Sequence, residues 1–230
     1  MSKKLAVITG AGSGLGASLA RRFSDLGYHV ALLGRNEHKL KKVGETLKSD
    51  DFSVHSVDVA DYSAVETTFK GITEQYGDVD VLVNNAGTGA FKLVEDISAD
   101  EINSMIDVNV KGTIYCTQQV VPSMKKNNDG VIANIVSTAG LVGKMNETVY
   151  CASKFGARGF TEALLVELKD TDIRIFGAYM GGMKTEFWNG ILEEKQMSGL
   201  MDPEDIADII MANVKERKNL TVEQVVIKNH

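Results

Sequence analysis

Four glycines fall within seven consecutive positions near the start of the chain, at residues 10–16, directly after the apolar run of residues 5–9. Glycine is needed where a backbone turns with positive φ, or where another molecule must approach with no Cβ in the way. Both needs arise where a strand leads into a helix whose N-terminus binds a phosphate. A plain strand-to-helix turn needs only one or two glycines, so the cluster predicts a phosphate-binding turn.

The length and composition indicate one folded domain, residues 1–230, around a single core. Hydrophobic residues make up 43% and charged residues 24%, as in ordinary globular proteins. The formal charge of −6 argues against nucleic acid or an anionic membrane as the main partner, because either would require a basic face. We therefore expect a small-molecule ligand.

The first residues, MSKK, precede an apolar stretch too short for a signal sequence or a membrane span. We expect the protein to be cytoplasmic. Cys116 and Cys151 are the only cysteines, and their spacing indicates no metal site. We expect both to be small core residues.

Strand-like apolar runs alternate with amphipathic segments along the whole chain, which is typical of parallel strands joined by helical crossovers. Several runs are apolar throughout, as strands covered on both faces should be. The pattern predicts an α/β fold: a doubly wound, Rossmann-type, mostly parallel seven-stranded sheet with helices on both faces. The expected strands are residues 5–9, 29–33, 52–57, 79–84, 131–137, 173–180 and 221–227.

Helix signals lie between these strands. Ser98 and Glu101 have the spacing of a capping box, and Asp202 precedes Pro203 at a helix start. The expected helices are residues 15–27, 36–49, 98–126, 150–170 and 203–216. The one long irregular stretch, residues 181–201, follows the sixth strand, where loops of this length usually cover a functional site, so we expect a substrate loop or lid there.

The glycine cluster fits three motifs, each weak alone. Gly12, Gly14 and Ala17 match G-x-G-x-x-G/A of dinucleotide-binding proteins, whereas G-x-G-x-G at residues 10–14 is typical of methyltransferases. T-G-x-x-x-G-x-G at residues 9–16 is the third. A nucleoside-triphosphate loop is excluded, because no Gly-Lys-Ser/Thr follows.

The end of the second expected strand favours NADP(H). A site for NAD(H) places Asp or Glu there to bind the ribose hydroxyls, but here Gly34 is followed by Arg35. A guanidinium pairs well with the 2′-phosphate. NAD(H) stays possible, because Glu37 could bind the ribose and Arg35 could be a solvated residue opening a helix.

Further motifs follow in order: Asp58 with Val59, NNAG at residues 84–87, Asn109, Ser137, and YCASK at residues 150–154. With the glycine turn, they make the chain resemble the short-chain dehydrogenase/reductase family over nearly its whole length. The resemblance implies an enzyme that interconverts a secondary alcohol and a ketone or aldehyde with a nicotinamide cofactor. It also implies a homodimer or homotetramer built through residues 98–125 and 150–169.

The resemblance also implies roles for individual residues. Asn84 would brace the central strands, and Asp58 and Val59 would flank the adenine. Together with Arg35, the expected cofactor-binding residues are Thr9, Gly10, Gly12, Ser13, Gly14, Leu15, Gly16, Asp58, Val59, Asn85, Ala86, Gly87, Tyr150, Lys154, Met183 and Thr185.

Four residues would form the catalytic group: Ser137, Tyr150, Lys154 and Asn109. Tyrosine titrates near ~10, so as an acid/base at neutral pH it needs a stabilised phenolate. Lys154 lies one helical turn after Tyr150, so we expect it to lower the tyrosine pKa. Ser137 would donate to the substrate oxygen, and Asn109 would link Lys154 to solvent through a water.

The chain departs from the family pattern after the sixth strand, where Met180 replaces the usual proline and Gly182 adds a glycine. Substrate shape should depend on residues 139–147 and 186–200. Phe187, Trp188, Ile191 and Leu192 indicate either a short lid helix or an ordinary packed segment. Lys144 and Lys184 could meet an acidic substrate or be solvated.

Two other functions are compatible with parts of the sequence. A non-catalytic NADPH sensor would use the same fold but would not need the four catalytic positions. A methyltransferase would explain the glycines but not Tyr150, Lys154 or NNAG.

Overall fold

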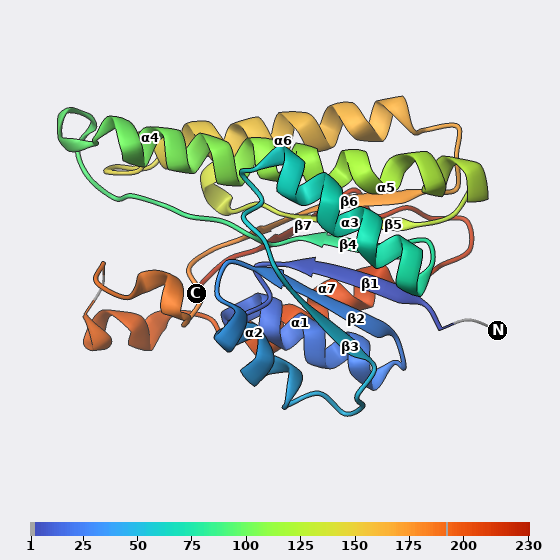
Figure 1. Cartoon of the computed structure of the whole chain (residues 1–230). Coiled ribbons are helices and arrows are strands. Elements are labelled where there is room, and N and C mark those ends of the chain that lie inside the picture. The colour runs from blue at the N-terminus through green and yellow to red at the C-terminus, as the bar shows by residue number, and fades with distance from the viewer. Residues whose placement is uncertain (1–2, 192) are drawn as a thin grey trace.

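The sheet has seven strands, all parallel, in the order β3-β2-β1-β4-β5-β6-β7 (Figure 1). The computed structural model describes residues 3–191 and 193–230. The predicted doubly wound fold is confirmed, with strand ends within a few residues of expectation. The strands are β1 (Leu5–Thr9), β2 (His29–Gly34), β3 (Phe52–Ser56), β4 (Val81–Asn84), β5 (Val131–Ile135), β6 (Arg174–Met180) and β7 (Gln224–Ile227).

Helices cover both faces of the sheet (Figure 1). On one face lie α1 (Gly14–Asp25), α2 (Glu37–Gly44) and α7 (Pro203–Val214). On the other lie α3 (Tyr62–Tyr76), α4 (Ala99–Ile106), α5 (Thr113–Asn127) and α6 (Thr148–Glu167).

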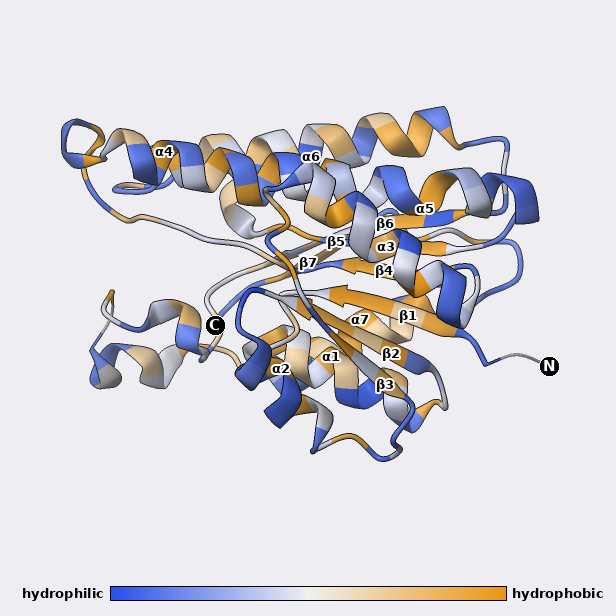
Figure 2. Ribbon diagram, in the orientation of Figure 1, coloured by the Kyte–Doolittle hydropathy of each residue, from blue (hydrophilic) through white to orange (hydrophobic). Residues whose placement is uncertain are grey.

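Each strand contributes to two cores because successive side chains point to opposite faces. In β1, Ile8 packs with Phe23 of α1, whereas Val7 belongs to the core that contains Phe69 of α3. The central strands are therefore largely hydrophobic, whereas the helices carry both hydrophobic and hydrophilic residues (Figure 2). Cys116 and Cys151 are both buried, as expected.

The sequence analysis did not predict α3. Its buried residues, Val65, Phe69 and Ile72, lie at helical spacing, and the Asp61 side chain caps its N-terminus by accepting from the Ala64 N–H at 3.0 Å. The helix expected at residues 36–49 is shorter and ends at Gly44. Strand β3 approaches closely there, because a Cβ on Gly44 would lie 2.3 Å from the ring of Phe52.

The long helix expected at residues 98–126 is divided. Between α4 and α5, residues Asp107–Gly112 form a π-helical segment. Such wide turns insert a residue into a helix and often occur at functional sites. This segment contains Asn109, which lies inside the single long helix that the sequence predicted.

A chain of buried hydrogen bonds runs from α5 to α6 by way of the neighbouring strands β4 and β5. Asn84 of β4 donates to Thr117 Oγ1 at 3.0 Å and to Asn134 Oδ1 at 2.9 Å. Asn134 of β5 donates in turn to Thr161 Oγ1 at 2.9 Å. Asn84 therefore braces the central strands, as the sequence indicated.

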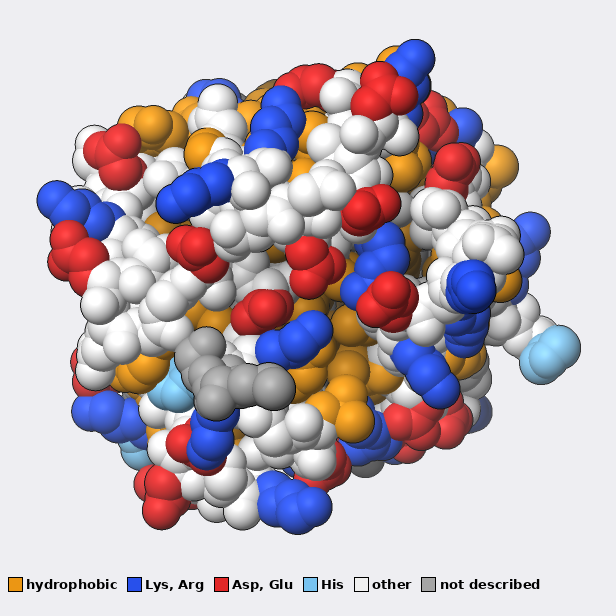
Figure 3. Space-filling model, turned by 90° about the vertical axis from the view of Figure 1, so that its right-hand side faces the viewer, with side chains coloured by type: hydrophobic (Ala, Val, Ile, Leu, Met, Phe, Trp, Pro, Cys, Tyr) orange, Lys and Arg blue, Asp and Glu red, His pale blue; other side chains and the backbone are white. Residues whose placement is uncertain are grey.

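The amino ends of the strands form the edge of the sheet away from the glycine turn. Figure 3 looks onto this side, where acidic and basic side chains are interspersed without a continuous patch of either sign. Within residues 3–191 and 193–230, no helix is long and apolar enough to cross a bilayer.

We predict that Thr161→Val lowers the free energy of unfolding by about 1–3 kcal/mol, because it leaves the buried Asn134 amide without its acceptor. Urea unfolding would measure the change. The matched control is Thr67→Val on the exposed face of α3, where we expect a change below about 0.5 kcal/mol. Equal effects of the two substitutions would contradict the prediction.

Candidate active site

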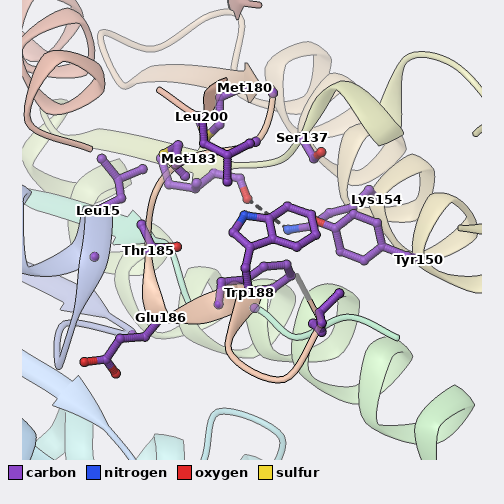
Figure 4. Close-up of a pocket in the computed structure, with 18 of the residues that line it drawn as sticks. Leu15, Ser137, Tyr150, Lys154, Met180, Met183, Thr185, Glu186, Trp188 and Leu200 are labelled. Atoms are coloured by element: carbon purple, nitrogen blue, oxygen red, sulfur yellow. Dashed lines mark hydrogen bonds between the residues drawn. The ribbon is translucent and has the colours of Figure 1, made fainter. Parts of the chain in front are cut away.

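A cavity of about 810 Å³ opens at the carboxyl ends of the strands (Figure 4). It is bounded by the β1–α1 turn, the ends of β4, β5 and β6, the start of α6, and the segment 181–201. Twelve of the expected catalytic and cofactor-binding residues line it: Gly10, Ser13, Gly14, Leu15, Asn85, Ala86, Gly87, Ser137, Tyr150, Lys154, Met183 and Thr185.

The glycine turn is built without room for side chains. Gly10 and Gly14 have positive φ, +64° and +51°. A Cβ on Gly16 would lie 2.3 Å from the Gly10 carbonyl oxygen, and one on Gly10 would lie 2.9 Å from the Cα of Ala86. The turn leads into α1, whose first N–H groups have no partner within the helix. It therefore fits the pyrophosphate of a dinucleotide.

Thr9 and Asn85 join the glycine turn to the end of β4. Thr9 Oγ1 accepts from the N–H groups of Asn85 and Ala86 at 2.9 and 3.0 Å. The Asn85 amide donates to the carbonyl oxygens of Thr9 and Gly10 at 3.0 and 3.1 Å. Thr9 is buried beneath the turn, so its role is to hold the turn in place.

Arg35, Asp58 and Val59 lie outside the lining of the main cavity. Arg35 is exposed just before α2. Asp58 Oδ1 accepts from the Ala60 N–H at 3.0 Å, and Val59 is buried against Gly112. Arg35 directly follows β2, and Asp58 and Val59 follow β3.

Gly12 and Gly16 also lie outside the main cavity. Gly12 borders an adjoining hollow that it shares with Ser13 and Gly14, and Gly16 is buried in α1.

Tyr150 and Lys154 lie in the first two turns of α6 and line the same cavity (Figure 4). The Lys154 Nζ lies 5.8 Å from the centre of the Tyr150 ring and donates to the Ile135 carbonyl at 3.3 Å. Ser137 follows β5 and caps a short 3-10 helix, Thr138–Gly140. All three side chains are buried, with exposed fractions of 8%, 5% and 9% for Tyr150, Lys154 and Ser137.

The expected lowering of the Tyr150 pKa is wrong for this structure. Burial raises the pKa of the phenol above its ordinary value, and the interaction with Ser137 only partly offsets this. The rings of Phe91 and Phe187 pack beside the phenol and contribute to its burial, an effect that i to i+4 spacing does not reveal. Tyr150 is therefore protonated at neutral pH.

Burial has the opposite effect on the neighbouring amine. It lowers the pKa of Lys154 to about 8, because a charged ammonium loses its hydration there. Lys154 thus keeps its positive charge at neutral pH but loses it under mildly alkaline conditions.

Asn109 is buried behind the cavity and fixes the loop after β4. Its Oδ1 accepts from the Thr88 N–H at 2.9 Å, and its Nδ2 donates to the Thr88 carbonyl at 2.8 Å and to Ser153 Oγ at 2.9 Å. Only Gly87 separates it from Lys154, since a Cβ on Gly87 would lie 3.3 Å from Asn109 Oδ1 and 3.5 Å from Lys154 Nζ.

Within its described residues, 181–191 and 193–201, the segment 181–201 contains the 3-10 helices Glu186–Trp188 and Glu194–Gly199 and no α-helix. It approaches the glycine turn, because a Cβ on Gly14 would lie 2.9 Å from Thr185 Cγ2. Phe187, Trp188 and Ile191 line the cavity. The expectation for Leu192 lies outside the described residues.

Several lining residues were not expected from the sequence, and two of them, Lys39 and Phe91, bear on the site's chemistry. Lys39 lies on α2 next to Gly12 and forms an ion pair with Glu186 of the segment 181–201. Because Lys39 follows Arg35 by four residues, the sequence could have indicated that the two side chains lie near each other. Phe91 lies in the loop after β4, and nothing in its neighbourhood in the sequence indicated the contact with Tyr150.

The described residues include no group of three or more His, Cys, Asp or Glu side chains placed to hold a metal ion.

Comparisons with known proteins agree with this geometry. The sequence profile of the short chain dehydrogenase family matches residues 4–196. An uncharacterized oxidoreductase of Staphylococcus aureus (strain N315) is 31% identical over 228 residues, covering 99% of this chain and 98% of the relative.

Solved structures are similar over the whole fold. An alcohol dehydrogenase from the archaeon Thermococcus sibiricus, complexed with 5-hydroxy-NADP, has a TM-score of 0.90 and 30% identity over 98% of this chain and 96% of its own. A serine dehydrogenase complexed with NADP+ has a TM-score of 0.91 and 29% identity over 96% and 93%. The chain thus belongs to the short-chain dehydrogenase family of oxidoreductases.

Proposed function

We propose that the protein is an NADP(H)-dependent oxidoreductase that interconverts a secondary alcohol and a ketone or aldehyde. The observation that carries this proposal is the convergence of Ser137, Tyr150 and Lys154 on one cavity that the glycine turn also borders. A protein that only senses NADPH would not need a buried hydroxyl, phenol and amine at that place.

The dinucleotide would lie between the glycine turn and the ends of β4 and β6. Gly10, Gly14 and Ser13 would hold the pyrophosphate, and Met183 and Thr185 would contact the nicotinamide end. Arg35, together with Lys39, would bind the 2′-phosphate. The NADP complexes of the two similar structures support this choice over NAD(H). When bound, the reduced nicotinamide supplies a hydride for the new C–H bond as the carbonyl electrons move to oxygen.

The side chains provide the proton and stabilise the charge. Tyr150 Oη holds the proton that the substrate oxygen takes up, and the raised pKa of the phenol keeps it protonated before reaction. Ser137 Oγ donates a hydrogen bond to the same oxygen. The charged amine of Lys154 stabilises the phenolate that remains.

Solvent would return the proton to Tyr150 by way of Lys154. The main-chain carbonyl oxygen of Asn109 already accepts from Thr113 Oγ1 at 3.0 Å and has a second lone pair for a bridging water. The side chain of Asn109, in the π-helical segment, lies behind Gly87 and close to the Lys154 amine. Asn109 would thus act as a positioning residue for the relay.

Two further expectations extend the proposal. Segment 181–201 would close over the bound cofactor, held by the Lys39–Glu186 ion pair. Exposed apolar residues on α4 and α6, namely Ile102, Phe155 and Val166, suit a homodimer or homotetramer built through these helices.

We predict that Tyr150→Phe lowers the rate of ketone reduction by about 10²–10⁴-fold, because the proton donor is lost. NADPH binding should be retained, measured by quenching of the emission of Trp188, the only tryptophan. Tyr62→Phe on the surface of α3 is the control. Undiminished turnover would refute the role of Tyr150, and NADPH binding without oxidation of any alcohol in a broad panel would favour the sensor.

Arg35→Ala is expected to weaken NADPH binding by about 10–100-fold, since it removes a charge-assisted bond to the 2′-phosphate. NADH binding should change less than about twofold. Lys42→Ala, an exposed lysine on α2, controls for the general loss of positive charge. Titrations of both cofactors provide the comparison, and equal losses for both would remove the phosphate assignment.

Lys154→Met is expected to abolish turnover while raising the free energy of unfolding at pH 7 by about 3 kcal/mol, since the wild type buries a charge. The unfolded chain keeps its lysine proton up to about pH 10.5, whereas the folded chain loses it near pH 8. Relative to Lys154→Met, the wild type should therefore gain stability as the pH rises between these values. The buried Cys116 thiol, whose pKa is raised to about 12, lowers the stability of both proteins above pH 9 and cancels in this comparison.

The variant should lack this rise in stability. Urea unfolding at several pH values, with Lys169→Met as an exposed control, measures it. A difference in stability between the wild type and Lys154→Met that stays constant over this range would contradict the assigned burial cost.

A further inference from the structure

Two aromatic side chains lie beside the catalytic phenol, and a third packs on both of them. Phe91, after β4, has its ring centre 5.2 Å from that of Tyr150, and Phe187 lies at 6.2 Å. Trp188 packs on Phe91 at 5.0 Å. The rings are tilted or edge-on to one another, the arrangements that aromatic pairs prefer. The substrate end of the cavity therefore has an aromatic wall.

The charged side chains at this end are already paired. Lys144 Nζ lies 4.0 Å from a Glu147 carboxylate oxygen and donates to Thr138 Oγ1 at 2.9 Å. At the other end of the cavity, Lys39 pairs with Glu186. Among the described lining residues, this leaves Lys154, which lies beside Tyr150, as the cation outside an ion pair.

We propose that the physiological substrate is an uncharged aryl ketone, or the corresponding aryl secondary alcohol. Its ring would pack among Phe91, Phe187 and Trp188, with the carbonyl oxygen toward Ser137 and Tyr150. This inference rests on the proposed carbonyl chemistry. Lys144 is already paired with Glu147, and Lys154 is the amine that the proposed mechanism uses beside Tyr150, so a carboxylate or phosphate on the substrate would have to compete for one of these two lysines. An aryl group instead takes up contacts that the aromatic wall already offers.

The position of Trp188 supports a ring as the occupant. Trp188 and Tyr150 border the same hollow (Figure 4), and the indole also lies near Gly182, where a Cβ would be 3.7 Å from it. An aromatic substrate can replace the indole against Phe91 without exposing that ring to water. A small aliphatic ketone would leave part of the wall unfilled.

Steady-state reduction with NADPH of three probes, acetophenone, butan-2-one and pyruvate, tests the proposal. We expect kcat/KM for acetophenone to exceed both others at least tenfold. Phe91→Leu and Phe187→Leu keep apolar volume but remove a ring, and each should lower kcat/KM for acetophenone about 5–20-fold and for butan-2-one less than twofold. Tyr62→Leu, a surface aromatic on α3, should change neither.

Quenching of Trp188 by NADPH verifies that each variant is folded and binds cofactor. A preference for pyruvate or butan-2-one would overturn the aryl assignment. So would a preference for acetophenone that both ring variants retain. Equal losses of kcat/KM for acetophenone and butan-2-one in the ring variants would overturn it as well. These results leave the proposed function standing. If the wild type reduces no ketone, the proposed function itself fails, and the substrate inference fails with it.

Discussion

The site depends on the close approach of one backbone to another at the β1–α1 turn. A methyl group at Gly16 would overlap the Gly10 carbonyl, and one at Gly10 would press on the backbone at Ala86. Because this space stays empty of side chains, the amide of Asn85 can bond the turn to the end of β4. The start of α1, the ends of the central strands and Thr185 then meet around one cavity.

The second constraint is the burial of two groups with opposite protonation chemistry. Removing water raises the pKa of the Tyr150 phenol and lowers that of the Lys154 amine, so both shifts disfavour charge. In the proposed mechanism, this cost keeps a proton donor and a cation near one substrate oxygen. On that proposal, stability and activity oppose each other at Lys154.

The aromatic wall links this chemistry to specificity. The rings of Phe91 and Phe187, which pack beside Tyr150, are also the surface that a substrate would meet. They come from loops on opposite sides of the cavity, whereas the phenol comes from α6. The same packing thus sets the protonation state of the acid and the shape of the space beside it.

The sequence alone determined the parallel sheet, the glycine turn, and the placing of Tyr150 and Lys154 on one helix face, because period, glycine content and i to i+4 spacing are local properties. It did not determine the break at Asn109, the contact of Phe91, or the direction of the Tyr150 pKa. Helix α3 was locally encoded at Val65, Phe69 and Ile72 but overlooked. What only the tertiary structure decided was burial, since desolvation of a side chain depends on residues distant in the chain that fold against it.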